Sequence, residues 1–105
     1  MAEITDVLTK LLERTNEGKV QWKPTSNERT FAAVVGTLSV MILTDQDGLV
    51  LSILDKSGRE IERLTNYDFR TPTEVENEMI ELYKIARHAA LNVGSQLDEL
   101  LKELG

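Results

Sequence analysis

The stretch from Thr30 to Leu64 limits what this chain can fold into more than any other part of it. It is rich in β-branched and aliphatic residues, and turn signals interrupt it at Gly36-Thr37, at "DQDG" and at "DKSG". Short apolar runs separated in this way are typical of an antiparallel meander. The inward-facing phase changes at Gly36-Thr37, and a two-residue hairpin explains the change because glycine readily adopts a positive φ. We therefore predict an antiparallel sheet of about four to five strands over residues 19–65.

Helical periodicity flanks this region on both sides. Residues 1–17 are predicted to be an amphipathic helix, because apolar residues recur there at spacings of three and four: Ile4, Val7, Leu8, Leu11 and Leu12. In "TPTE", Thr71, Pro72 and Glu74 resemble a capping box. A second apolar stripe follows it and consists of Val75, Met79, Leu82, Ala86, Ala89, Val93, Leu97, Leu100 and Leu104. This stripe predicts one helix over 72–104, bent at Gly94. Two helices broken at "NVGS", with Ser95 as a second cap, remain the alternative. At 105 residues, the chain is expected to form one α+β domain over 1–105.

The predicted C-terminal helix is too long for its sheet. About 32 residues would span roughly 48 Å, whereas strands of six or seven residues span about 20 Å. The overhanging turns carry Leu97, Leu100, Leu101 and Leu104. Leaving these leucines in water would cost roughly 1.5 to 3 kcal/mol each compared with burying them. We therefore predict a homo-oligomer, with a dimer preferred, in which these four leucines form the interface.

The second face of the sheet also carries apolar residues, although a freely solvated face would be mostly polar. These residues are Ala32, Val34, Met41, Leu43, Val50 and Leu54. Two arrangements would explain them: either the two helices cover opposite faces of the sheet, or one face meets a partner.

The stretch "LTDQDGLVL" has the glycine and aspartates of a calcium loop but not its spacing. With Gly48 at position six, Asp45 and Asp47 occupy positions three and five, but the ligand positions one and twelve hold Leu43 and Leu54. The flanking runs also have the composition of strands, not helices. "DQDG" is therefore interpreted as a hairpin loop.

Composition excludes several classes of function. The chain has no cysteine and one histidine, His88, so neither a thiolate site nor a histidine pair can form, and we expect no metal and no cofactor. The formal charge of −6, with dispersed basic residues, argues against nucleic-acid binding. The first residues lack the pattern of a signal peptide and no apolar run could span a membrane, so we expect a cytoplasmic protein without membrane contact.

Aromatic residues near basic ones form the candidate binding set. It consists of Trp22, Lys23, Arg63, Tyr67, Phe69 and Arg70. Arginine and aromatic side chains are frequent at protein interfaces and can also hold the base and phosphate of a nucleotide. The competing interpretation places Trp22 and Phe69 in the core, at the two ends of the meander. Four carboxylates could in principle form a hydrolytic site, although no spacing favours one: Asp55, Glu60, Glu62 and Asp68.

The order of "LLERTNEGKVQW", "FAAVVGTLSVMI", "LSILDKSGREIERL" and "ELYKIARHAALNV" resembles a group of short uncharacterised proteins encoded by bacteria and their phages. This resemblance implies a small α+β module and no particular activity. The first hypothesis for function is a non-enzymatic, homo-oligomeric interaction module that binds a protein or ligand in a bacterial or phage conflict setting. The alternative is a module that sequesters a small anionic, nucleotide-like signal at a subunit interface. A carboxylate-based hydrolase is a weaker alternative.

Overall fold

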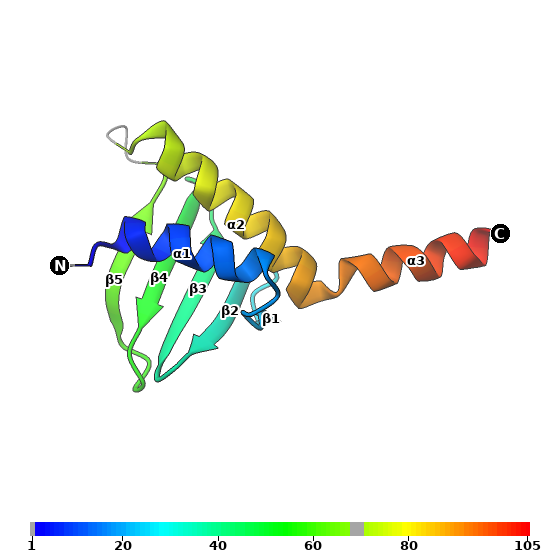
Figure 1. The fold of residues 1–105 in the computed structure, drawn as a ribbon, viewed down its shortest axis with the longest axis horizontal. Helices are drawn as coiled ribbons and strands as arrows, with labels where there is room; N and C mark the ends of the chain where they lie inside the picture. Colours follow the sequence, from blue (N-terminus) through cyan, green and yellow to red (C-terminus); the bar gives the residue numbers. More distant parts are fainter. Residues whose placement is uncertain (1, 68–70) are drawn as a thin grey trace.

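The protein is an α+β fold in which an antiparallel meander packs against two helices and a third helix projects away (Figure 1). The computed structural model describes residues 2–67 and 71–105. The elements follow the chain in this order: α1 (Ile4–Asn16), β1 (Lys23–Pro24), β2 (Thr30–Val35), β3 (Leu38–Thr44), β4 (Leu49–Leu54), β5 (Glu60–Thr65), α2 (Thr73–Leu91) and α3 (Val93–Leu104). The predicted α+β class and the predicted antiparallel sheet are therefore confirmed.

Helix α1 begins at a reciprocal cap. The Glu3 side chain accepts from the backbone N–H of Asp6, and the Asp6 carboxylate accepts from the backbone N–H of Glu3 at 3.2 Å. Both contacts satisfy N–H groups that the first turn of a helix leaves unpaired. The face that α1 turns towards the sheet buries Leu8, Leu11, Leu12 and Thr15.

The five strands pair strictly in sequence order, β1-β2-β3-β4-β5, and all pairs are antiparallel. The predicted two-residue hairpin at Gly36-Thr37 is confirmed, because Val35 pairs with Leu38 and Gly36 has a φ of 64°. "DQDG" also turns between two strands: the N–H of Asp45 donates to the carbonyl of Gly48 at 2.9 Å. The Asp45 carboxylate accepts from the N–H groups of Asp47 and Gly48, so it serves the turn as predicted.

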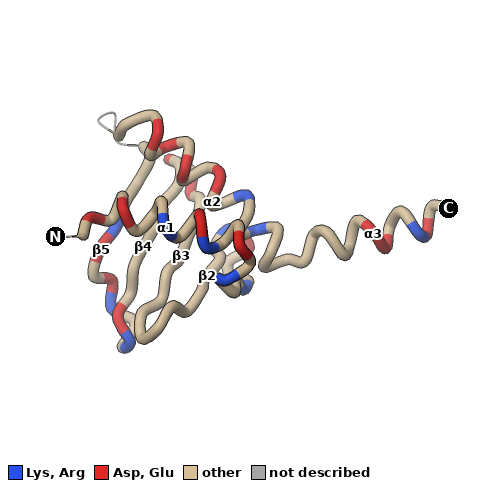
Figure 2. The backbone as a smooth tube through the Cα atoms, viewed as in Figure 1, with Lys and Arg blue, Asp and Glu red and all other residues tan. Residues whose placement is uncertain are grey.

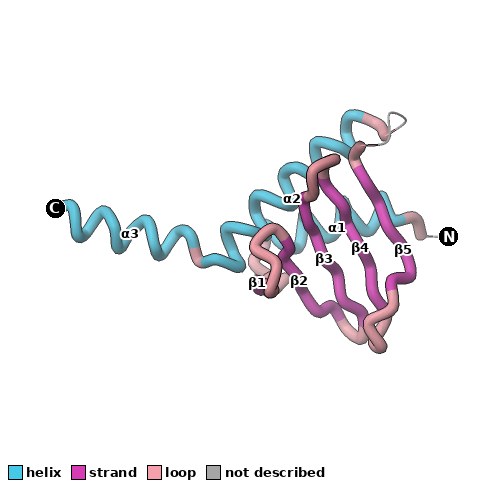
Figure 3. Tube along the Cα trace, turned by 180° about the vertical axis from the view of Figure 1, so that it is seen from behind, coloured by secondary structure: helices cyan, strands magenta, loops and turns pink. Residues whose placement is uncertain are grey.

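Helices α1 and α2 lie on the same face of the sheet, as the two opposite views show (Figures 1 and 3). The alternative in which they cover opposite faces is therefore wrong. In each strand, alternate side chains face the two helices, as the alternation predicts. These side chains form the core together with residues of α1 and α2. The core includes Leu8, Leu11, Trp22, Phe31, Ala33, Val40, Ile42, Leu49, Leu51, Ile53, Met79, Leu82 and Ala86.

The C-terminal segment forms two helices that separate at Asn92, so the prediction of one helix over 72–104 bent at Gly94 is wrong, and the alternative of two helices broken within "NVGS" is confirmed. Asn92 has φ 55° and ψ 43°, a left-handed conformation that ends α2 and starts α3. Asparagine accepts this conformation more readily than most residues, so it closes a helix as glycine often does. The proposed cap at Ser95 is also wrong, because Ser95 lies inside α3.

The start of α2 likewise differs from the predicted capping box. Pro72 occupies the N-cap position, and among the described residues no side chain caps the helix. The Thr71 hydroxyl instead donates to the carbonyl of Thr65, the last residue of β5, at 3.2 Å.

Beyond Asn92, α3 extends away from the sheet, and the molecule measures 52 × 31 × 26 Å along its principal axes (Figure 3). Among the described elements, α3 contacts only α2. Within residues 2–67 and 71–105, no helix is both long enough and apolar enough to cross a membrane.

Candidate functional site

The apolar stripe of α3 is exposed from Leu97 to Leu104. No residue of α3 is buried, and its four leucines have exposed fractions of 51% (Leu97), 53% (Leu100), 67% (Leu101) and 74% (Leu104). A contiguous exposed apolar surface is typical of an interaction site, whereas single apolar residues scattered over a surface are ordinary. The structure thus places all four predicted interface leucines on a helix that its own chain leaves uncovered.

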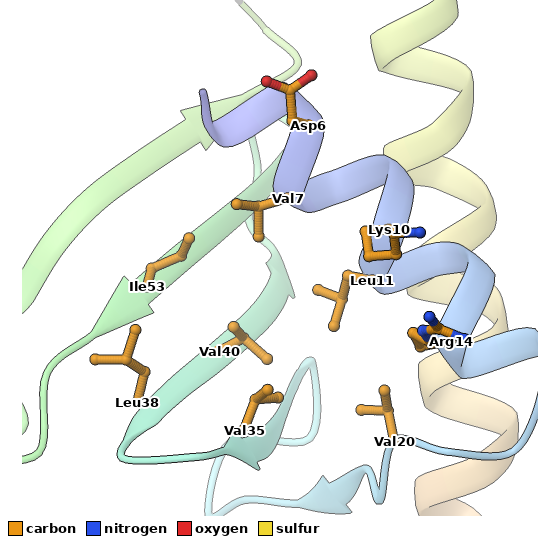
Figure 4. A pocket seen from close by; sticks show the side chains of 10 residues that line it. All are labelled: Asp6, Val7, Lys10, Leu11, Arg14, Val20, Val35, Leu38, Val40 and Ile53. Atoms are coloured by element: carbon orange, nitrogen blue, oxygen red, sulfur yellow. The ribbon is translucent and has the colours of Figure 1, made fainter. Parts of the chain in front are cut away.

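A second apolar surface is a groove beside α1, at the end of the sheet that carries the Gly36 hairpin (Figure 4). It has a volume of about 480 Å³. The groove forms because α1 crosses the sheet while strands β2 to β4 continue past it (Figure 1). Its walls are almost entirely apolar and consist of Val7, Leu11, Val20, Val35, Leu38, Val40 and Ile53. Val35 and Leu38 are 48% and 38% exposed, so this end of the core is open to solvent.

The charged rim of the groove comes from α1. Asp6, Lys10 and Arg14 line it (Figure 4). Lys10 lies 3.6 Å from Glu13, and Arg14 donates to Glu17 at 2.7 Å, a bond that raises the pKa of the guanidinium. Both pairs are exposed to solvent, where such contacts contribute little and can exchange partners.

Trp22 lies in the core, which corrects its assignment to a binding surface. Its side chain is 5% exposed, and the indole N–H donates to the Thr15 hydroxyl at 3.1 Å. Thr15 in turn donates to the carbonyl of Leu11 at 2.7 Å. Trp22 therefore ties the segment before β1 to the last turn of α1 and presents no surface to a partner, as the competing interpretation held.

The other predicted binding residues that the structure describes do not all meet in one site. Lys23 is exposed on β1, at one edge of the sheet, whereas Arg63 is on β5, at the opposite edge. Tyr67 follows β5 and is 45% exposed. Phe69 and Arg70 lie outside the described residues.

On the face of the sheet away from the helices, the Arg63 side chain belongs to a small polar network. Arg63 donates to Glu60 at 3.0 and 3.1 Å, and the hydroxyl of Ser52 donates to Glu60 at 2.7 Å. The Ser52 hydrogen bond, followed by the Arg63 contacts, lowers the pKa of the Glu60 carboxyl. Glu60 is thus committed to a structural contact, and this network holds β5 against β4 across the register shift between Ile53 and Leu54.

The remaining predicted carboxylates that the structure describes, Asp55 and Glu62, do not converge with Glu60 on one point. Asp55 accepts from Ser57 and Arg59 within the β4–β5 turn, and these bonds lower the pKa of its carboxyl. Glu62 is exposed on β5, and Asp68 lies outside the described residues. Among the described residues, no cluster of histidine, aspartate or glutamate could hold a metal ion. His88 is exposed on α2.

A further depression, of about 540 Å³, was missed in the sequence. It lies between the β1–β2 loop and the C-terminal half of α2, and its lining includes Arg29, Phe31, Tyr83 and Arg87. The rings of Phe31 and Tyr83 lie 5.7 Å apart in a tilted arrangement. The spacing of Tyr83 and Arg87, one helical turn apart, was visible in the sequence. Nothing in the sequence indicated that Arg29 would lie beside them, because folding alone brings that loop to α2.

Comparison of the chain with protein-family models, with curated proteins and with solved structures found no match in any of the three.

Proposed function

We propose that this protein acts by association and not by catalysis: it is a homo-oligomeric interaction module in which α3 joins two copies of the chain. The single observation that carries this proposal is the exposure of all four leucines on a helix that leaves the body of its own chain. Full burial of an exposed leucine is worth roughly 1.5 to 3 kcal/mol. These leucines are half to three-quarters exposed, so covering the remaining surface of four in each of two chains supplies a corresponding share of that energy.

The body of the protein then presents the second face of its sheet to another molecule. Met41 and Leu43 are half-buried there and Val34 is 74% exposed, so this face offers apolar contacts next to the Glu60–Arg63 pair. Apolar residues beside an arginine suit a protein partner. From the resemblance described above, we also propose that the protein acts in the bacterial cytoplasm, in a bacterial or phage conflict setting.

Light scattering coupled to size exclusion tests the association. The intact chain should elute with a mass above the 11.8 kDa of one chain. The double variant Leu97→Gln/Leu101→Gln should shift to the mass of one chain, because both changes remove apolar surface from the stripe. Glu99→Gln is the matched control, since it changes the polar side of the same helix and should leave the mass unchanged. A mass near 11.8 kDa for the intact chain at every concentration would contradict the proposal.

The depression beside α2 supports a second candidate function, the binding of a small anionic ligand. Arg29 and Arg87 supply two positive charges against the one negative charge of Glu28, and Tyr83 supplies an aromatic face, which together suit a nucleotide-like molecule. A ligand that binds only the folded state raises the melting temperature in proportion to ln(1 + [L]/Kd). Thermal shift against a panel of nucleotides should show a rise that Arg87→Ala removes and Lys84→Ala, on the same helix, retains.

A further inference from the structure

We infer that the groove beside α1 is the receptor for α3 of a second copy of this chain, so that two copies exchange their C-terminal helices. This inference rests on the proposed function and specifies where the exposed helix binds. The two surfaces are complementary in shape, because the groove is concave with apolar walls and α3 is a convex helix with an apolar stripe. Each copy therefore carries both halves of the same contact.

The placement of α3 favours a second copy over the groove of its own chain. α3 points away from the body in both opposite views (Figures 1 and 3). To reach its own groove, the helix would have to reverse direction at Asn92, whose backbone already holds the break between α2 and α3. A neighbouring copy can receive α3 without that reversal, and a two-fold axis then makes the contact twice and closes the assembly.

The charges around the two surfaces are complementary. On a helix with 3.6 residues per turn, Asp98 and Glu103 border the leucine stripe of α3, whereas Lys102 lies on the opposite side. The groove has Lys10 and Arg14 on its rim, with Asp6 at the Val7 end (Figure 4). Figure 2 shows the acidic and basic residues along α1 and α3. The acidic borders of α3 can therefore pair with the basic part of the rim, in exchange for the exposed pairs that Lys10 and Arg14 make within α1.

The number of residues involved suits a stable dimer. Exchange would place in each chain's share of the interface both the ten residues that line the groove and the apolar side of α3 with its acidic borders. Interfaces of standard size use about 20 to 30 residues per partner. Pairing of α3 with α3 alone would use far fewer, and a helix of three turns is marginal as an isolated coiled coil.

Cysteine cross-linking tests this arrangement, because the natural chain has no cysteine to interfere. Val35→Cys places a thiol in the groove, and Leu101→Cys places one on α3. The control is Val34→Cys, whose side chain is one residue away but on the opposite face of the sheet, and is more exposed at 74%. A disulfide requires Cβ atoms within about 4.5 Å, so it reports direct proximity.

Equimolar mixtures of single-cysteine proteins, incubated to allow exchange and then mildly oxidised, should give disulfide-linked dimers. We expect the 35–101 dimer to exceed the 34–101 dimer by about tenfold, since only the groove brings the thiols into bonding range. Non-reducing electrophoresis and mass spectrometry of the linked peptides identify each product. The double variant Lys10→Glu/Arg14→Glu should weaken dimerisation, and Asp98→Lys/Glu103→Lys in the same chain should restore it.

Other products would overturn the inference in distinguishable ways. A dominant 101–101 product would show that α3 pairs with α3, and a dominant 34–101 product would place α3 on the open face of the sheet. An intrachain disulfide in the double variant Val35→Cys/Leu101→Cys, at the mass of one chain, would show that α3 folds back. A dimer by light scattering without any 35–101 product would exclude the groove while keeping the proposed function, whereas an intact chain that is monomeric throughout would exclude both.

Discussion

Helices α1 and α3 are similar in length and amphipathic character but opposite in burial. Helix α1 has 13 residues and buries four of them, whereas α3 has 12 residues and buries none. Leu8 in α1 is fully buried, while Leu101 in α3 is 67% exposed. The difference does not arise from the sequence of either helix. It arises because α1 lies across the sheet, whereas the left-handed residue Asn92 directs α3 away from it.

The largest expected effect separates these two helices directly. Leu8→Ala should lower the free energy of unfolding by about 2–5 kcal/mol, because it leaves a cavity in the core. Leu101→Ala should change it by less than about 0.5 kcal/mol at protein concentrations low enough to keep the chain monomeric. Urea denaturation monitored by circular dichroism measures both. An equal loss for the two variants at low concentration would show that α3 is buried in its own chain and would end the comparison.

A smaller effect is expected for the hydrogen bond between Trp22 and Thr15, which anchors the last turn of α1 in the core. Among the described residues, helix α3 makes no such contact. Thr15→Val retains the shape of the side chain but leaves the indole N–H of Trp22 buried without its acceptor. We expect a loss of about 1–3 kcal/mol in the free energy of unfolding. In a Trp22→Phe background, where the indole N–H is already absent, the same change should cost clearly less. Equal costs in both backgrounds would show that the hydrogen bond contributes nothing.

The smallest expected effect is the pH dependence of stability that comes from Glu60, a residue of the body and not of α3. The pKa of Glu60 is lowered from its ordinary value of 4.5, first by Ser52 and then by Arg63. The folded state therefore binds this proton less readily than the unfolded state does. The stabilisation is present above pH 4.5 and is lost as the pH falls through the lowered pKa. Glu60→Gln should flatten the acid side of the profile of melting temperature against pH.

The control for this prediction is Glu28→Gln, a change in the exposed loop before β2, which should leave the acid side of the profile intact. The effect of Glu60→Gln should also persist in the Leu97→Gln/Leu101→Gln background, because the network belongs to the body. An effect that disappears in that background would connect Glu60 to the association of α3 instead.

Sequence reasoning identified four leucines that the structure leaves exposed on α3, but it did not predict the groove that we propose as their receptor. The leucines form a periodic pattern within one helix, and such a pattern is readable locally. The groove combines Val7 from α1, Val20 from the following segment and Val35 and Ile53 from two strands. Its openness depends on how far α1 extends over the sheet, and this depends on packing and not on any local pattern.

The candidate binding set illustrates the opposite failure. Trp22 belongs to the predicted set because it is an aromatic residue beside Lys23, yet its ring completes the core beneath α1, as the competing interpretation held. Arg63 and Lys23 are both basic residues suited to binding, but the order of the strands places them at opposite edges of the sheet. Residue type alone therefore cannot show which side chains share a site.

The sequence by itself determined the local elements and the phase of each strand. Alternation from Phe31 to Ile42 specified which side chains face the helices, and glycine at position 36 specified the hairpin, because both depend on neighbouring residues in the chain. Tertiary structure alone decided that α1 and α2 share one face of the sheet and that a groove stays open beside α1. These outcomes depend on how packed surfaces cover one another, and local periodicity carries no information about what lies on the other side of a contact.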